Sequence, residues 1–207
     1  MFLDRVDAGR RLARRLEYLD GRDAIVLGLP RGGVPVAFEV ATALAAPLDV
    51  IVVRKLGAPR NPEFALGAIG ESGVRVLDPD AIRATGTSDA ELGIIERHAR
   101  TELARRTALY RGGRGPVSVA GKTAVIVDDG IATGATARAA CMITRALGAE
   151  SVVLAVPVAP PDWVESVGPV ADEFVCLETP AHFFAVGQWY SDFTQTTDDE
   201  VIRCLRR

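Results

Sequence analysis

The sequence TAVIVDDGIATGAT, residues 123–136, joins an apolar run to two adjacent carboxylates and then to a turn of small residues. The run Val125–Val127 is typical of a buried parallel strand, which is apolar on both faces. Small side chains in the turn leave backbone amides open at the start of the following helix, where an anion is stabilised. The stretch therefore predicts a strand, an anion-binding turn and a helix in an α/β domain.

The polar groups of this stretch suit one kind of ligand. Thr133 and Thr136 offer hydroxyl donors to the anion, which is most simply a phosphate. Asp128 and Asp129 only accept hydrogen bonds once ionised, so they suit two vicinal hydroxyl groups. A turn after a strand often contains one capping Asp, but that role leaves the second Asp unexplained. The pattern indicates a ribose 5-phosphate site, with these residues of the turn as ligands: Gly130, Ile131, Ala132, Thr133, Gly134, Ala135 and Thr136.

A second candidate site lies upstream, after an apolar strand expected at residues 24–29. Pro30-Arg31-Gly32-Gly33 follows that strand, and a helical pattern runs from Val34 to Leu44. Two glycines permit a tight turn with exposed amides, and the guanidinium group of Arg31 offers a fork of donors to phosphate oxygens. Alone, this short motif is more often an ordinary turn. Its place one strand and one helix before the diol-phosphate motif indicates a pyrophosphate site.

Together the two sites resemble those of the type I phosphoribosyltransferases. The signature of that family is an apolar strand, two acids, a short turn and T-G-x-T, which here corresponds to Asp128, Asp129 and residues 133–136. The segment Arg31-Gly32-Gly33 is similar to the pyrophosphate loop of the bacterial xanthine-guanine enzymes. P-loop and dinucleotide-binding motifs are not found in the sequence.

The resemblance implies a Rossmann-like parallel sheet flanked by helices, in a single domain over residues 1–207. It implies transfer of phosphoribose from the magnesium complex of phosphoribosyl pyrophosphate (PRPP) to a nitrogen heterocycle, with release of pyrophosphate. Mg²⁺ would meet Asp128 and Asp129 indirectly, through ribose hydroxyls or water, and the protein would be a homodimer. The family also implies a cis peptide bond between Pro30 and Arg31.

An irregular segment separates the two sites. Arg54 and Lys55 end an apolar run, and residues 55–73 are rich in Gly and Pro, as in a functional or disordered loop. Residues 65–77 within and beyond it have a hairpin-like pattern. The resemblance implies a flexible loop here that closes over the donor, with Arg54 and Lys55 supplying positive charge for pyrophosphate.

The general base of the hypoxanthine-guanine enzymes has no counterpart in the turn. Ala132 occupies its position. Adenine enzymes also carry a small residue there and use a loop carboxylate, which makes Glu63 or Glu71 the candidate base. The residues expected to act in catalysis are Asp128, Asp129, Arg31, Lys55 and Glu63.

The rest of the chain supplies elements around these sites. A stripe of leucines predicts an N-terminal surface helix within residues 1–22. A capping box at Ser88–Glu91 predicts an inserted helix over about residues 88–111, in which Glu102 and Arg106 form a helix-supporting pair. Strands and helices alternate through the core, residues 23–177, and this alternation predicts ligands at the carboxyl ends of parallel strands.

The tail, residues 178–207, departs from this alternation and concentrates aromatic rings in a chain with few others. Such rings commonly cap a core. The family, however, uses a variable hood to hold the acceptor, and aromatic rings stack well on a flat heterocycle. We therefore expect the tail to form the hood, with Trp189 or Tyr190 stacking on a planar acceptor.

Overall composition narrows the classes of function. The net charge of −3 and the pI near 5.5 argue against a nucleic-acid groove, and no apolar run is long enough to span a membrane. Three scattered cysteines fit a reducing cytoplasm, and the two histidines are not at zinc-ligand spacing. The first hypothesis is therefore an enzyme. The alternatives are a non-catalytic PRPP sensor, for which no helix-turn-helix unit or basic stripe is visible, and a plain nucleotide-binding module.

Overall fold

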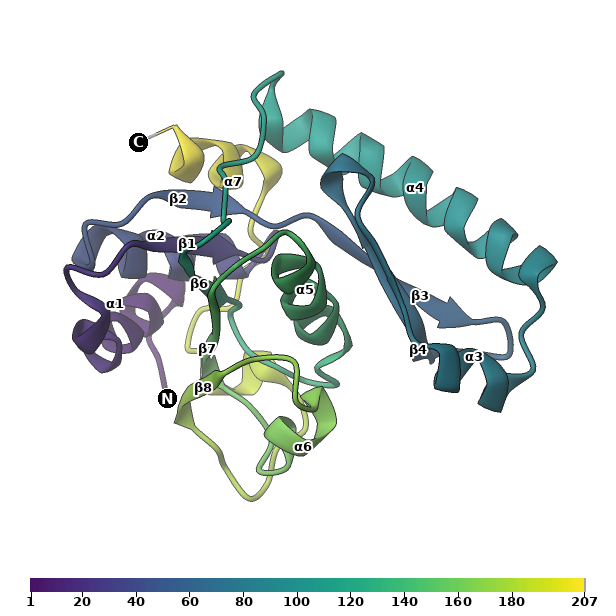
Figure 1. The fold of residues 1–207 in the computed structure, drawn as a ribbon. Coiled ribbons are helices and arrows are strands. Elements are labelled where there is room, and N and C mark those ends of the chain that lie inside the picture. Colours follow the sequence, from purple (N-terminus) through teal and green to yellow (C-terminus); the bar gives the residue numbers. More distant parts are fainter. Residues whose placement is uncertain (207) are drawn as a thin grey trace.

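The computed structural model describes residues 1–206, without the side chains of Glu63 and Ser72. Its centre is a parallel sheet of five strands in the order β2-β1-β6-β7-β8 (Figure 1). The strands are β1 (Ala24–Gly28), β2 (Leu48–Val50), β6 (Thr123–Val127), β7 (Ser151–Val158) and β8 (Glu173–Glu178). The predicted Rossmann-like sheet is confirmed. Because β1 lies between β2 and β6, the loops that follow β1 and β6 open into one crevice at the switch point of the sheet.

Helices cover both faces of the sheet (Figure 1). They are α1 (Arg5–Arg15) and α2 (Gly33–Ala43) on one face, and α5 (Ala135–Ala146) and α6 (Trp163–Val167) on the other. The side chains of β6 alternate between them, because Val125 and Val127 pack in the cluster with α1 and α2 whereas Ile126 packs in the cluster with α5. Burial on both faces explains why this strand is a continuous apolar run.

The largest departure from the sequence prediction is the segment after β2. It forms an antiparallel sheet of β3 (Val53–Ala58), β4 (Asn61–Gly70) and β5 (Arg75–Leu77), with the short 3₁₀ helix η2 (Glu71–Gly73) and helix α3 (Pro79–Thr85). The hairpin predicted within residues 65–77 is confirmed by the pairing of β4 with β5, whereas the irregular loop expected over the rest of residues 55–73 is wrong. Closure of this segment over a donor stays a prediction. The glycines of this segment permit close strand contact instead, since a Cβ on Gly57 would lie 2.3 Å from the carbonyl oxygen of Pro62.

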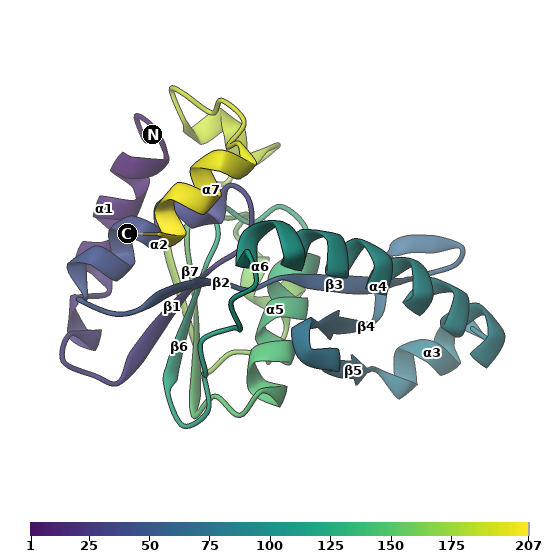
Figure 2. The same cartoon turned by 90° about the horizontal axis from the view of Figure 1, so that it is seen from above.

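The predicted inserted helix is confirmed as α4 (Asp89–Arg111). Ser88 and Glu91 form the capping box at its start, and Gly112 ends it in the left-handed conformation. Figure 2 shows α4 lying along the antiparallel sheet, at one end of the molecule. We call β3, β4, β5, α3 and α4 together the cap.

The N-terminal segment lies beside the 3₁₀ helix η3 (Val186–Trp189). Phe2 and Tyr190 form an isolated parallel bridge, and the amide of Phe2 donates to the carbonyl oxygen of Trp189 at 2.7 Å. The N-terminal helix is confirmed as α1, which the 3₁₀ helix η1 (Glu17–Leu19) follows. Among residues 1–206, no helix has the length and apolar character that crossing a membrane requires.

The sequence prediction misses the last helix, α7 (Asp198–Leu205). It packs against α2 and α4. Thr197 and Glu200 form a capping box at its start, which is the same signal that identifies α4.

Candidate active site

The two predicted phosphate loops lie side by side, because they follow neighbouring strands. The amide of Leu29 donates to the carbonyl oxygen of Val127 at 2.9 Å, so pairing continues to the ends of β1 and β6. A Cβ on Gly33 would lie 2.6 Å from that same carbonyl oxygen, and one on Gly32 would lie 2.0 Å from Oδ2 of Asp129. Both positions therefore require glycine, and the Arg31-Gly32-Gly33 loop packs directly on the acidic pair.

The acidic pair, Asp128 and Asp129, is partly buried and held from several sides. The amide of Asp129 donates to Oδ1 of Asp128 at 2.9 Å. Burial, reinforced by the charge of Asp129, raises the pKa of Asp128 well above its ordinary value. Asp129 in turn accepts a hydrogen bond at Oδ2 from Nε of Arg5, at 2.8 Å. Arg5 stands 124 residues away in the sequence, so no local pattern could have identified it.

The turn that precedes α5 is open to solvent at Ala132, Thr133 and Thr136. Gly134, at the N-cap of α5, has a φ of +74°, which side-chain-bearing residues rarely adopt. Within the described part of the chain, no group accepts a hydrogen bond from the amides of residues 132–137. A run of unpaired amides beside two threonine hydroxyls is the arrangement that binds an anion at a helix N-terminus.

Two predicted ligands of the turn have structural contacts instead. The amide of Ile131 donates to the carbonyl oxygen of Val158 at 2.9 Å, and its side chain is buried. Gly130 lies against Val186 of η3, where a Cβ would approach the side chain to 2.5 Å. These two residues shape the turn from its buried side.

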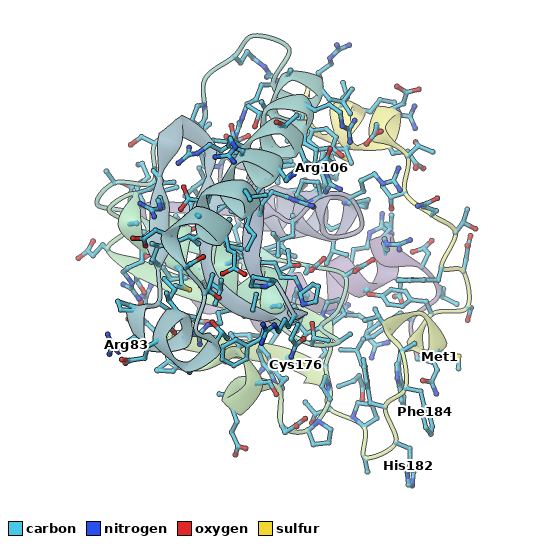
Figure 3. The ribbon with its side chains drawn as sticks, turned by 90° about the vertical axis from the view of Figure 1, so that its right-hand side faces the viewer. Met1, Arg83, Arg106, Cys176, His182 and Phe184 are labelled. Carbon is cyan, nitrogen blue, oxygen red and sulfur yellow. The ribbon has the colours of Figure 1, made fainter. Side chains whose placement is uncertain are left out.

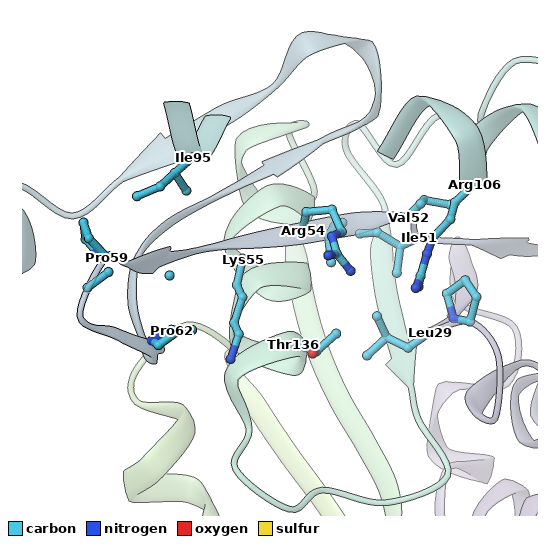
Figure 4. Close-up of a pocket in the computed structure, with 14 residues that line it drawn as sticks. Leu29, Ile51, Val52, Arg54, Lys55, Pro59, Pro62, Ile95, Arg106 and Thr136 are labelled. Atoms are coloured by element: carbon cyan, nitrogen blue, oxygen red, sulfur yellow. The ribbon is translucent and has the colours of Figure 1, made fainter. Parts of the chain in front are cut away.

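A cavity of about 520 Å³ lies beside the turn, between the core and the cap. Pro30 and Thr136 line it on the core side. The cations that line it are Arg54 and Lys55 of β3 and Arg106 of α4. Figure 4 shows the three head groups pointing into the same space. Arg54 and Lys55 are predicted site residues, whereas the sequence analysis treats Arg106 only as the helix partner of Glu102, a contact that the structure shows at 2.8 Å.

Arg31 and Arg54 are both partly buried. Neither guanidinium group has a hydrogen-bond acceptor or counter-ion among the residues that the structure describes. A partly buried charge is stabilised when an anion binds from outside. The peptide bond between Pro30 and Arg31 is cis, as predicted.

The two candidate bases have different outcomes. Glu71 accepts hydrogen bonds from Nε and Nη2 of Arg111, at 2.8 and 2.9 Å. It is thus a partner in a buried ion-pair network, and its candidacy as a general base is wrong. The side chain of Glu63 lies outside the described part of the structure, so its role as the base stays a prediction.

The aromatic tail contacts the acidic pair, but not as expected. The ring of Tyr190 is 6% exposed and lies between Phe2 and Phe193, with ring centroids 5.3 and 5.0 Å away. Its hydroxyl donates to the carbonyl oxygen of Asp129 at 2.6 Å. The prediction that Tyr190 stacks on an acceptor is therefore wrong, because its ring supports Asp129 from the buried side. The ring of Trp189 packs in the same cluster.

The exposed ring of the tail is Phe184, at 83%. Figure 3 shows it with His182 on the outer edge of the tail, pointing away from the body of the protein. None of the residues that line the 520 Å³ cavity is aromatic. This cavity therefore offers a planar acceptor no aromatic ring to stack on.

Solved structures of other proteins superpose on most of this chain. A protein of Thermus thermophilus, TT1426, has a crystal structure that superposes with a TM-score of 0.91 at 47% identity, covering 99% of this chain and 97% of its own. A hypothetical protein of Neisseria gonorrhoeae, crystallised with bound ppGpp, shares the fold at 12% identity with a TM-score of 0.51, covering 100% and 97% of the two chains.

Sequence relatives carry a family name. A Mycobacterium tuberculosis protein, named provisionally as a phosphoribosyl transferase, is 60% identical over all 207 residues. The chain spans about half the length of this curated relative, 47%. The family profile described as phosphoribosyl transferase domain matches residues 3–190. The chain therefore belongs to the phosphoribosyl transferase domain family.

Proposed function

We propose that this protein transfers phosphoribose from Mg-PRPP to a nitrogen heterocycle and releases pyrophosphate. The observation that carries the proposal is the open turn at residues 132–137, whose amides have no acceptor among the described residues and which directly follows two carboxylates. The turn suits the 5-phosphate of PRPP, and Asp128 and Asp129 suit the ribose diol.

The pyrophosphate of PRPP would lie on the other side of the ribose. The Arg31-Gly32-Gly33 loop packs on the acidic pair, and Arg54, Lys55 and Arg106 line the adjoining cavity. Guanidinium and ammonium groups stabilise negative charge that develops on a departing pyrophosphate. The protein therefore offers complementary groups to the 5-phosphate, the ribose diol and the pyrophosphate of PRPP.

The acidic pair is chemically suited to the Mg²⁺ that the family uses with PRPP. Among the described residues, no group of three or more His, Cys, Asp or Glu side chains could hold a metal ion. Mg²⁺ commonly binds one or two carboxylates together with phosphate oxygens and water, which fits Asp128 and Asp129 with a bound donor. When bound, Mg²⁺ would neutralise charge on pyrophosphate.

The general base, the oligomeric state and the cellular location are proposed from the family resemblance. We propose that Glu63 acts as the general base, that the protein is a homodimer, and that it acts in the cytoplasm. A second candidate function is a PRPP sensor without catalysis. The observation that favours it is the burial of Tyr190, a ring expected to stack on an acceptor, together with the lack of an aromatic ring among the residues that line the 520 Å³ cavity.

The experiment that decides between them measures pyrophosphate release. The protein is mixed with PRPP, MgCl₂ and a panel of purines, pyrimidines and heterocyclic carboxylic acids. We expect release with at least one class of acceptor. Tight PRPP binding without release for any acceptor would support the sensor, and failure to bind PRPP would refute both.

We expect Gly32→Ala to weaken PRPP binding by about tenfold or more, because the added Cβ would displace the carboxylate of Asp129 from its place beside the loop. The neighbour is a side chain, so the fold should persist. Isothermal calorimetry with PRPP and MgCl₂ measures the affinity, and circular dichroism checks the fold. Gly115→Ala is the matched control, since a Cβ there would meet no atom within 4 Å. Equal PRPP affinity in both variants contradicts the packing argument.

A further inference from the structure

We propose that Arg5 of α1 is a positioning residue, which holds the carboxylate of Asp129 in place for the ribose of PRPP. The proposal rests on the proposed function, in which the acidic pair accepts the ribose hydroxyls. It makes the N-terminal helix part of the donor site.

Three contacts fix the side chain of Arg5. Its Nε donates to Oδ2 of Asp129 at 2.8 Å, and its Nη1 donates to the carbonyl oxygen of Thr194 at 2.7 Å. The guanidinium carbon lies 4.0 Å from the centroid of the Phe193 ring. The two hydrogen bonds hold two edges of the planar guanidinium group, and the Phe193 ring covers one of its faces. Together they fix its orientation.

The same tail holds the backbone of Asp129. Tyr190 donates its hydroxyl to the carbonyl oxygen of Asp129 at 2.6 Å, and its ring packs on Phe193. Arg5 and Tyr190 therefore fix the carboxylate and the carbonyl group of one residue. The N-terminal helix and the aromatic tail supply them, and the bridge between Phe2 and Tyr190 joins these two segments.

Stability alone is a poor explanation for this ion pair. The side chains of Arg5 and Asp129 are only 12% and 14% exposed, so much of the hydration of both charges is lost. At that depth the cost of desolvation offsets most of the attraction, and an apolar pair would stabilise the fold as well.

The geometry at Asp129 fits a role in binding. Its Oδ2 accepts from Arg5 and lies against Gly32, whereas no amide, hydroxyl or cationic group of the described residues donates to its Oδ1. Two adjacent carboxylates repel each other, and a fixed cation on one oxygen keeps that carboxylate from turning away. Oδ1 is then left in a fixed position for a ribose hydroxyl.

The test compares two ligands in Arg5→Gln, Arg5→Lys and a matched control. Arg10→Gln is the control, because Arg10 lies on the same helix and is 68% exposed, and its ion pair is with Glu39, at 2.9 Å, instead of the acidic pair. Calorimetry measures binding of PRPP and of inorganic pyrophosphate, each with MgCl₂, and thermal unfolding without ligand reports the fold.

We expect Arg5→Gln to weaken PRPP binding by about tenfold and to leave pyrophosphate binding unchanged, because pyrophosphate has no ribose. Arg5→Lys should recover part of the loss, and Arg10→Gln should bind both ligands as the unaltered protein does. In an Asp129→Asn background, Arg5→Gln should add little further loss, since the two residues act through one contact.

Other outcomes separate the two proposals. Equal weakening of PRPP and pyrophosphate, or unchanged binding of PRPP, overturns the role of Arg5 while the proposed function stands. Full additivity of Arg5→Gln with Asp129→Asn also overturns it. If the unaltered protein binds pyrophosphate but not PRPP, the proposed function is wrong, and the role of Arg5 falls with it.

Discussion

Replacing Asp128 and Asp129 together by Asn is expected to lower PRPP affinity by about a hundredfold or more while the protein still folds. Asn has nearly the same shape, but its amide is a weaker acceptor than a carboxylate and brings an N–H group that can point at the ribose. Hydrogen bonds to a charged group contribute about 1.5–3 kcal/mol each, and tenfold in affinity corresponds to about 1.4 kcal/mol. One such bond at Asp129 and an ordinary hydrogen bond of about 0.5–1.5 kcal/mol at Asp128 account for the expected loss.

The two single variants, Asp128→Asn and Asp129→Asn, should differ in how much PRPP affinity they lose. Burial raises the pKa of Asp128, so its neutral form is favoured in the folded protein. Asp129 has Arg5 as a cationic partner at 2.8 Å. Asp129→Asn should therefore weaken PRPP binding more than Asp128→Asn does.

The same difference predicts a pH dependence of stability. A carboxyl group whose pKa is raised on folding destabilises the fold once it ionises, so its favourable contribution is lost as the pH rises through the raised pKa. Asp128→Asn should accordingly raise the free energy of unfolding near neutral pH, and its advantage should shrink in acid. Urea denaturation at two pH values measures this difference in the free energy of unfolding.

For the double variant, Asp128→Asn with Asp129→Asn, an unchanged PRPP affinity would contradict the ribose site.

The parallel core could be predicted because its signals are local. The run of β6 is apolar on both faces, since Val125 and Ile126 pack in different clusters, and a short stretch of sequence shows this directly. The loops after β1 and β6 are also contiguous motifs. Their meeting follows from the rule that ligands bind at the carboxyl ends of neighbouring parallel strands.

The cap could not be predicted in the same way. Its strands β3 and β4 contain Gly57, Pro62 and Gly67, and such residues ordinarily indicate a loop. In the structure the glycines allow close approach of a neighbouring strand, which depends on where that strand lies. The Gly-rich composition is the same in both cases, so composition alone leads to the wrong interpretation.

Contacts between distant residues were also beyond sequence reasoning. Arg5 and Tyr190 reach Asp129 across 124 and 61 residues of sequence. An arginine in the first turn of an exposed helix and a tyrosine in an aromatic tail each have ordinary structural explanations. Only the folded arrangement shows that they converge on one aspartate.

Arg111→Met is expected to lower the free energy of unfolding by about 3–5 kcal/mol, because it leaves two buried carboxylates without their cation. Arg111 is 8% exposed on its side chain and pairs with Asp49 and Glu71. Its Nη2 also donates to the carbonyl oxygen of Val50 at 2.9 Å. The network joins the end of α4 and η2 to β2, so it fastens the cap to the core.

Urea denaturation measures this loss against two controls. Arg105→Met removes an exposed pair with Glu102, and such pairs contribute only about 0.2–1 kcal/mol. The triple variant Arg111→Met, Asp49→Asn, Glu71→Gln removes the charges together and should recover much of the stability, since the damage comes from unpaired carboxylates. A triple variant less stable than Arg111→Met would mean that packing, and not charge, dominates at this joint. A loss in Arg111→Met no larger than in Arg105→Met would mean that water reaches the network, and that the cap is attached to the core by its apolar contacts alone.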